Sequence, residues 1–341
     1  MQNDVDVVII GAGPCGLAAA ITAMRAGLRV QLFDKGPVVS TIVAYPTYAT
    51  FFSTAEKLSI GGLPFVLAEA KPTRKDALAY YRAAVKHFGI PVRQYEAVER
   101  ISGAAGAFTV HTRSLEGTFE TRCRAVIVAT GYFGTPNRIG VPGEDLPHVT
   151  HVYHEGHPAF QRSVVVVGGG NSAAEAALDL WRTGASVTLV HFGPSWDKRI
   201  KPWVLPDVDN RIAEGSIEAR WNSRVTAIEP GWVSIAPSNG SGAAERLRAE
   251  HVYLMTGFAP DLQLLLETGV TVDPVTGVPA HDPKTLETDV PGIYMVGVLV
   301  AGFDANQVFI ENGRFHGERI VAHLTGRPVP RERAISGDPD A

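Results

Sequence analysis

Two glycine-rich turns, far apart on the chain, could each bind the pyrophosphate of a dinucleotide. The first is Gly11-Ala12-Gly13-Pro14-Cys15-Gly16 after the apolar run 5–10, and the second is Gly168-Gly169-Gly170-Asn171-Ser172-Ala173 after 164–167. In such a turn the first glycine permits a tight bend, the second lets backbone approach the pyrophosphate, and the last position lets the helix pack closely. The N-terminus of that helix faces the anion. Two such turns predict an oxidoreductase that uses two dinucleotides.

The residue that ends the second strand of each unit distinguishes the two sites. Asp34 follows the run 29–33, and a carboxylate there accepts hydrogen bonds from an adenosine ribose. His191 follows the run 186–190, and the basic residues Lys198 and Arg199 come soon after. A missing acid with nearby cations suits a ribose that carries a 2′-phosphate, although the same basic run could be a solvated loop. We therefore expect FAD at the first site and NADPH at the second.

The elements around these turns predict an α/β fold with two Rossmann-like dinucleotide-binding domains. We expect residues 1–156 to begin the FAD-binding domain, 157–257 to form an inserted NADPH-binding domain, 258–330 to return to the first domain, and 331–341 to form a flexible tail. Residues 37–73 read as a long irregular loop of the kind that is usually functional. Thr73 and Asp76 open an amphipathic helix, and residues 92–122 alternate as an antiparallel meander does.

Composition limits the partners. A net charge of −4 gives no sign of nucleic-acid or acidic-membrane affinity. No uninterrupted apolar run approaches the roughly 18 residues of a membrane helix, and the first strand begins too early for a signal peptide. Two cysteines are too few for a disulfide framework. These features predict a cytoplasmic protein with neither nucleic acid nor membrane as partner.

The order of motifs resembles that of the low-molecular-weight thioredoxin reductase-like flavoproteins. The two glycine-rich turns alternate with Ala129-Thr130-Gly131 and Met255-Thr256-Gly257, and Gly297 follows near the C-terminus. The loops 45–53 and 304–313 are most similar to those of the bacillithiol disulfide reductase branch. The resemblance implies an FAD enzyme that uses NADPH to reduce a low-molecular-weight thiol disulfide, bacillithiol disulfide above all. It also implies, by analogy, a homodimer.

The chain departs from the thioredoxin reductase pattern at four places. No CxxC is present, so a dithiol relay to thioredoxin is not available. Gly297-Val298 replaces the usual Gly-Asp at the flavin ribityl chain, and His191-Phe192-Gly193 replaces the usual His-Arg-Arg at the 2′-phosphate. Asn306 stands in place of the arginine of the Arg-Gln-Ala motif.

Cys15 is the candidate catalytic residue, since the resemblance implies a thiol that acts on the disulfide. A thiol at a helix N-terminus would have its thiolate favoured by the helix dipole. Against this, the turn approaches the pyrophosphate, whereas the reactive ring lies at the far end of an extended FAD. Free cysteines are also commonly buried as packing residues. Both interpretations stay open at this point.

The candidate cofactor-binding residues follow from the turns and from the resemblance. The FAD group is Gly11, Gly13, Pro14, Cys15, Gly16, Asp34, Lys35, Tyr45, Phe52, Val98, Ala129, Thr130, Gly131, Gly297, Val298, Asn306, Gln307 and Val308. The NADPH group is Gly168, Gly170, Asn171, Ser172, Ala173, His191, Lys198, Arg199 and Gly257.

Other functions stay possible on the sequence. The histidines at 148, 151, 154 and 157 recur every three residues, but no convincing ligand shell completes them, so we assign no metal site. A ferredoxin- or flavodoxin-type NADP reductase, a flavin monooxygenase and an FAD-bound redox sensor remain as alternative functions.

Overall fold

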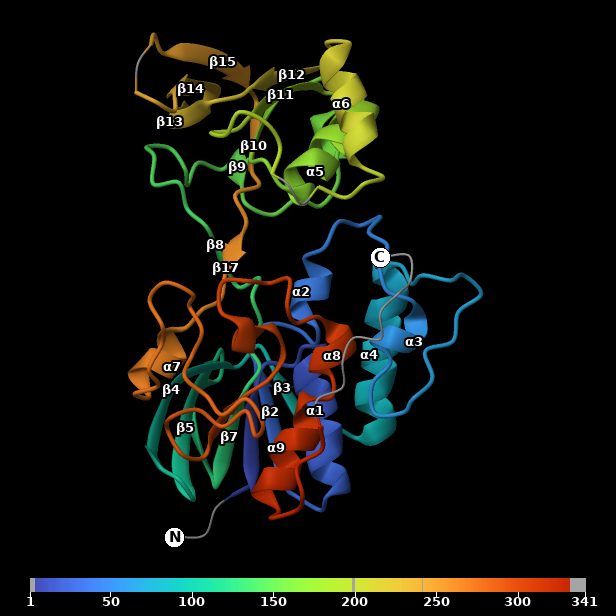
Figure 1. Ribbon diagram of the computed structural model, residues 1–341, viewed down its shortest axis with the longest axis vertical. Helices are drawn as coiled ribbons and strands as arrows, with labels where there is room; N and C mark the ends of the chain where they lie inside the picture. Colours follow the sequence, from blue (N-terminus) through green and yellow to red (C-terminus); the bar gives the residue numbers. More distant parts are fainter. Residues whose placement is uncertain (1–3, 198–199, 241, 332–341) are drawn as a thin grey trace. The chain divides into compact units, whose positions relative to one another are not determined.

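The computed structural model describes residues 4–197, 200–240 and 242–331, and the chain forms two compact units (Figure 1). The first unit comprises residues 1–43, 49–135 and 259–341, and the second comprises 44–48 and 136–258. Compared with the expected domains, the second unit also takes in residues 136–156 and the short segment 44–48. The expected domain boundaries stay a proposal, and of the expected tail only Arg331 lies among the described residues.

A parallel sheet of five strands forms the centre of the first unit. Its order is β18 (Ile293–Met295), β7 (Ala125–Val128), β1 (Val7–Ile10), β2 (Val30–Asp34) and β3 (Val92–Gln94). Every residue of β1 and β7 is buried. Continuous β-branched runs of this kind are typical of parallel strands that are covered on both faces.

Helix α1 (Pro14–Arg25) packs beside α9 (His316–Leu324) in the first unit (Figure 1). The approach is close, because a Cβ added to Gly317 would lie 2.6 Å from the Cα of Ala19. The C-terminal segment of the chain therefore packs on the helix that follows the first glycine-rich turn. The remaining helices of this unit are α2 (Ser40–Val43), α3 (Ala55–Leu58), α4 (Arg74–Phe88), α7 (Gln263–Glu267), α8 (Ile310–Gly313) and the 3₁₀ helix Gly297–Ala301.

The predicted start of α4 is confirmed. The Thr73 hydroxyl accepts a hydrogen bond from the Asp76 N–H, and the Asp76 carboxylate accepts one from the Thr73 N–H. The predicted irregular loop 37–73, in contrast, contains α2 and α3. Four-residue helices are too short to show a helical period in the sequence, which explains the difference.

The meander of the first unit consists of β4 (Ala97–Ala104), β5 (Ala107–Ser114) and β6 (Gly117–Cys123), all antiparallel. It begins later than residue 92 because β3 joins the parallel sheet instead. Phe108 and Val110 of β5 pack against Val8 and Val126 of that sheet.

The second unit repeats this plan. Its parallel sheet has the order β12 (Ile217–Arg220), β11 (Ser186–Val190), β10 (Ser163–Val167), β16 (His251–Leu254) and β9 (Val149–Thr150). Helices α5 (Asn171–Arg182) and α6 (Leu205–Ala213) accompany it, together with the 3₁₀ helix His157–Ala159. A second meander is formed by β13 (Ser223–Glu229), β14 (Gly231–Pro237) and β15 (Glu245–Ala249). Strands β8 (Thr135–Pro136) and β17 (Phe258–Ala259) pair with each other where the chain passes from one unit to the other.

Candidate functional site

The first glycine-rich turn joins β1 to α1 and leaves open space at Gly13. Gly11 has a φ of +109°, and a Cβ there would lie 2.3 Å from the carbonyl oxygen of Ala129. A Cβ on Gly16 would lie 2.1 Å from the carbonyl oxygen of Gly11, whereas one on Gly13 meets no atom of the described residues within 4 Å. No side chain caps α1 at Gly13. An open, uncapped helix N-terminus fits the pyrophosphate of FAD.

Asp34 braces this turn from the end of β2. Its Oδ2 accepts a hydrogen bond of 2.8 Å from the Ala12 N–H, and its Oδ1 accepts one of 2.8 Å from the Gly36 N–H. Burial raises the pKa of this carboxyl, while the two backbone bonds oppose the shift. The carboxylate thus fixes the backbone where an adenosine ribose is expected, and its contact with the ribose stays a prediction.

The second glycine-rich turn repeats the same geometry. A Cβ on Gly168 would lie 2.3 Å from the carbonyl oxygen of Met255, which corresponds to the contact of Gly11 with Ala129. No side chain caps α5 at Gly170, where an added Cβ would find its nearest neighbour, an oxygen of Asp197, at 3.7 Å. The second turn therefore also fits a pyrophosphate.

The His191 side chain packs against the second glycine-rich turn. Only 3% of the residue is exposed, and a Cβ added to Gly169 would lie 2.3–2.5 Å from its ring atoms. Burial lowers the pKa of His191, which keeps the imidazole neutral. The ring thus supports the turn, and a direct contact with NADPH stays a prediction. Lys198 and Arg199 lie outside the described residues.

Cys15 is the second residue of α1 and packs against two glycines. A Cβ on Gly313 would lie 2.9 Å from the Cys15 Sγ, and one on Gly297 would lie 3.3 Å from it. Burial raises the pKa of the Cys15 thiol to about 12. A thiol with this pKa is protonated at neutral pH, which favours the packing interpretation over a thiolate favoured by the helix dipole. The catalytic role of Cys15 stays a prediction.

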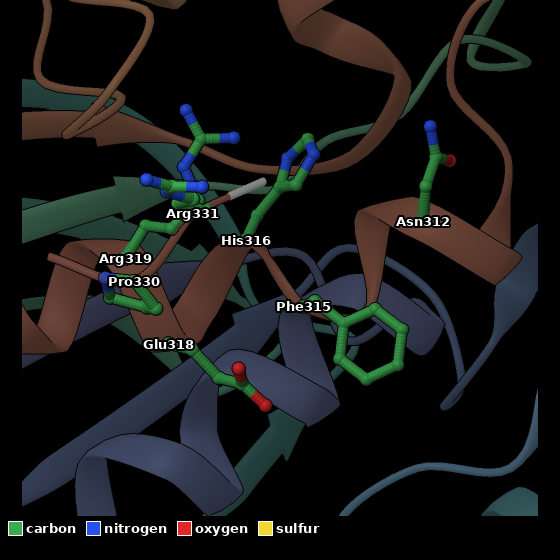
Figure 2. Close-up of a pocket in the computed structure, with 7 residues that line it drawn as sticks. All are labelled: Asn312, Phe315, His316, Glu318, Arg319, Pro330 and Arg331. Carbon is green, nitrogen blue, oxygen red and sulfur yellow. The ribbon is translucent and has the colours of Figure 1, made fainter. Parts of the chain in front are cut away.

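Gly297 is held by a histidine that sequence reasoning did not select. The Gly297 N–H donates a hydrogen bond of 3.2 Å to Nδ1 of His316, which is 3% exposed. Gly297 has a φ of +73°, so only a residue that tolerates the left-handed region fits there. Figure 2 shows the His316 ring in a small pocket with Arg319, from the same helix, and Arg331. The contact joins α9 to the expected ribityl position.

We expect His316→Phe to lower the free energy of unfolding by about 1–3 kcal/mol, because the buried Gly297 N–H loses its acceptor. Urea denaturation of wild type and variant at neutral pH measures this loss. His316→Asn is the matched control, since its amide oxygen can accept the same bond and should recover part of the stability. Equal losses in both variants would assign the effect to packing alone.

The same histidine predicts a pH dependence. Burial lowers the pKa of His316 from its ordinary 6.5 to about 4, with smaller contributions from Arg319 and His281. The unfolded chain therefore binds a proton before the folded chain does. The stabilisation is complete above pH 6.5 and is lost as the pH falls towards about 4. Wild type should lose more stability than His316→Phe across this window.

The other predicted residues occupy the same two units. Ala129, Thr130 and Gly131 follow β7. Val98 packs against the cluster that contains Phe108 and Val110, and Lys35 and Phe52 are exposed.

The predicted residues near the C-terminus lie just before α8. Asn306 and Gln307 both donate hydrogen bonds to the Asp304 carboxylate there. Tyr45 falls in the segment grouped with the second unit, so its expected place beside the flavin stays a prediction. In the second unit, Asn171 Oδ1 accepts a hydrogen bond from the Lys201 N–H.

The described ranges contain neither a metal-binding cluster nor a membrane-spanning helix. Within 4–197, 200–240 and 242–331, no group of three or more His, Cys, Asp or Glu side chains is placed to hold a metal ion. No helix in the same ranges is both long and apolar enough to cross a bilayer.

Comparison with known proteins identifies the family. The sequence profile described as pyridine nucleotide-disulphide oxidoreductase matches residues 8–297, which includes both glycine-rich turns. The chain belongs to the pyridine nucleotide-disulphide oxidoreductase family. It is accordingly an oxidoreductase with the thioredoxin reductase-like fold predicted from the motif order.

Two relatives are similar to the chain in sequence over nearly its whole length, and a third shares its fold. It is 42% identical over 320 residues to the bacilliredoxin reductase Bdr of Bacillus subtilis, covering 94% of this chain and 97% of that protein. The solved bacillithiol disulfide reductase Bdr (YpdA) from Bacillus cereus superimposes with a TM-score of 0.91 at 40% identity, over 95% of this chain and 99% of that one. A thioredoxin reductase of T. acidophilum shares the fold, with a TM-score of 0.70 at 23% identity over 95% of this chain and 99% of that one.

The cofactors of this family member are FAD and NADPH. The open turn at Gly13 fits the first, and the matching turn at Gly170 fits the second. The resemblance to bacillithiol disulfide reductases that the loops predicted is confirmed. Sequence reasoning missed His316, because it belongs to no motif and becomes notable only through its hydrogen bond to Gly297 in the folded chain.

Proposed function

We propose that this chain reduces bacillithiol disulfide at the expense of NADPH. The reaction converts one disulfide, one NADPH and one proton into two thiols and NADP⁺. The observation that carries the proposal is the near-full-length similarity, at 42% and 40% identity, to proteins named bacilliredoxin reductase and bacillithiol disulfide reductase.

The sequence supports a small disulfide over thioredoxin as the substrate. Thioredoxin reductases use a CxxC, and this chain holds only Cys15 and Cys123, far apart. Bound FAD supplies the two-electron chemistry that links a nicotinamide to a disulfide. The protein itself binds and orients the cofactors. Gly13 and Gly170 leave room for the pyrophosphates, Asp34 stabilises the first turn, and His316 holds Gly297 in place.

The alternative functions have weaker support. The solved flavin monooxygenase and thioredoxin reductases are at most 24% identical to the chain, which supports a shared fold and no more. A thioredoxin reductase of Listeria monocytogenes reaches 27% identity and a ferredoxin–NADP reductase of Granulibacter bethesdensis reaches 29%, both well below the 42% of Bdr. A redox sensor has no need of a second dinucleotide site, yet the second turn keeps the geometry of the first. We also propose a cytoplasmic homodimer. The free thiols Cys15 and Cys123 support a reducing compartment, and related reductases support the dimer by analogy.

Anaerobic oxidation of NADPH by the FAD-loaded protein tests the proposal. Bacillithiol disulfide should be reduced with two thiols formed per NADPH, and much faster than glutathione disulfide, oxidised thioredoxin or ferredoxin. Oxidised bacilliredoxin belongs in the same series, because one relative carries that name. Faster reduction of ferredoxin, or oxygen uptake coupled to hydroxylation of a substrate in a separate aerobic assay, would replace the proposal with one of the alternatives.

A further inference from the structure

The loop after β11 in the second unit is fastened to the start of β13. The Ser223 N–H donates a hydrogen bond of 2.9 Å to the His191 carbonyl, and the Asn222 N–H donates one of 2.8 Å to the Gly193 carbonyl. The Ser238 hydroxyl donates one of 3.0 Å to the carbonyl of Phe192. These bonds place Arg224, the second residue of β13, beside the carboxyl end of β11.

Arg224 stacks on Phe192 in this loop. The guanidinium carbon lies 4.6 Å from the centre of the Phe192 ring, and 54% of Phe192 is exposed. A guanidinium stacked on an aromatic face keeps its in-plane N–H groups directed outward, in the fork that matches two phosphate oxygens. The stack therefore orients the side chain for bidentate binding of an anion.

Arg224 also has no carboxylate partner among the described residues, whereas other arginines of the second unit do. Arg220 pairs with Glu245 at 3.0 Å, and Arg246 pairs with Glu229 at 2.7 Å. Within 4–197, 200–240 and 242–331, no Asp or Glu oxygen lies within ion-pair distance of Arg224. Its charge is available to a ligand.

The position of Arg224 is the one at which an adenosine ribose is expected. In a Rossmann-like unit the ribose lies beyond the carboxyl end of the second strand, and that strand here is β11. His191, the residue directly after β11, is buried against Gly169 and neutral, so it provides no positive charge at the surface. Phe192 and Gly193 stand where the family pattern carries arginines.

We propose that Arg224 binds the 2′-phosphate of NADPH and determines the preference for NADPH over NADH. This inference rests on the proposed function only in that NADPH is the electron donor. Arg224 supplies from β13 the charge that the family pattern supplies from the loop after β11.

Asp197 is the acidic residue beside His191, and it could favour NADH over NADPH. Its Oδ1 lies 3.8 Å from Nε2 of His191, and its backbone N–H donates a hydrogen bond to the Gly169 carbonyl, so it belongs to the pyrophosphate turn. A ribose that bonded to Asp197 through free hydroxyls would favour NADH instead.

Calorimetric titration of the FAD-loaded protein with 2′,5′-ADP and with 5′-AMP tests the inference without any turnover. The two probes differ only in the 2′-phosphate. We expect Arg224→Ala to weaken binding of 2′,5′-ADP by about tenfold to a hundredfold, as expected for one charged contact, and to leave 5′-AMP unchanged. Arg224→Lys should fall between wild type and Arg224→Ala, since it keeps the charge and loses the fork.

Arg248→Ala is the matched control. Arg248 is an exposed arginine of the same unit, on β15, so its removal changes the net charge equally. Equal weakening of 2′,5′-ADP by both variants, or no weakening by Arg224→Ala, would overturn the role of Arg224 and leave the reductase function standing. Tighter binding of 5′-AMP than of 2′,5′-ADP to the wild-type protein would overturn NADPH as the preferred donor as well.

Discussion

Gly13→Val should fold as the wild-type protein does and purify without FAD. A Cβ on Gly13 meets no atom of the described residues within 4 Å, and the backbone there is extended, with a φ of −72°. The added side chain therefore causes no clash within the protein and fills the space through which the pyrophosphate approaches. The absorbance spectrum of the purified variant measures flavin content, and circular dichroism checks the fold.

The second turn provides a matched control for this result. Gly170 has the same place before α5, an extended backbone with a φ of −95°, and similar space for a side chain. Gly170→Val should keep FAD and lose binding of NADPH, the reverse of Gly13→Val. Normal flavin content in Gly13→Val would show that the pyrophosphate does not bind at this turn. Loss of both cofactors in both variants would point to general misfolding.

Cys15→Ser should reduce turnover of bacillithiol disulfide by at least about a hundredfold and leave NADPH-dependent reduction of bound FAD intact. With a thiol pKa of about 12, Cys15 is protonated and neutral at pH 7, as serine is. The substitution thus keeps size, charge state and packing against Gly297 and Gly313, and removes only the sulfur. Stopped-flow spectroscopy separates the two half-reactions.

Two further measurements show whether the Cys15 sulfur takes part in disulfide reduction. If the Cys15 thiolate attacks the disulfide, the rate of disulfide reduction should rise about tenfold per pH unit below the thiol pKa. Cys123→Ser is the control, because Cys123 is also buried with a pKa raised to about 12 and lies at the end of β6, away from the turn. Cys15→Ser with near-wild-type turnover would show that the disulfide is reduced without a protein thiol.

The sequence predicted the parts of the fold that have a local signature. Both parallel sheets were expected from β-branched runs beside glycine-rich turns, and the start of α4 was expected from Thr73 and Asp76. The role of Gly11 as a close contact was also predictable, because a glycine with positive φ follows the first strand in this kind of turn. These features depend on residues near one another in the chain.

The parts that were missed depend on contacts between distant segments. His191 directly follows β11 as predicted, but the sequence does not show that its ring lies against Gly169, where the missing Cβ leaves room for it. The bond from Gly297 to His316 and the stack of Arg224 on Phe192 likewise form only in the folded chain. The sequence left open whether the helix N-terminus favours a Cys15 thiolate or the thiol is a packing residue, and the raised pKa beside Gly297 and Gly313 favours the second.

The pairing of β8 with β17 has a consequence for how the chain can be cut and rejoined. The strands at the two ends of the segment 136–258 are hydrogen-bonded neighbours, so their ends lie about one strand spacing apart. A short reverse turn could join Thr135 to Ala259 with little loop-closure entropy. The segment 136–258, which forms all of the second unit except residues 44–48, could therefore be removed or replaced by another nucleotide-binding domain without reshaping the ends at Thr135 and Ala259.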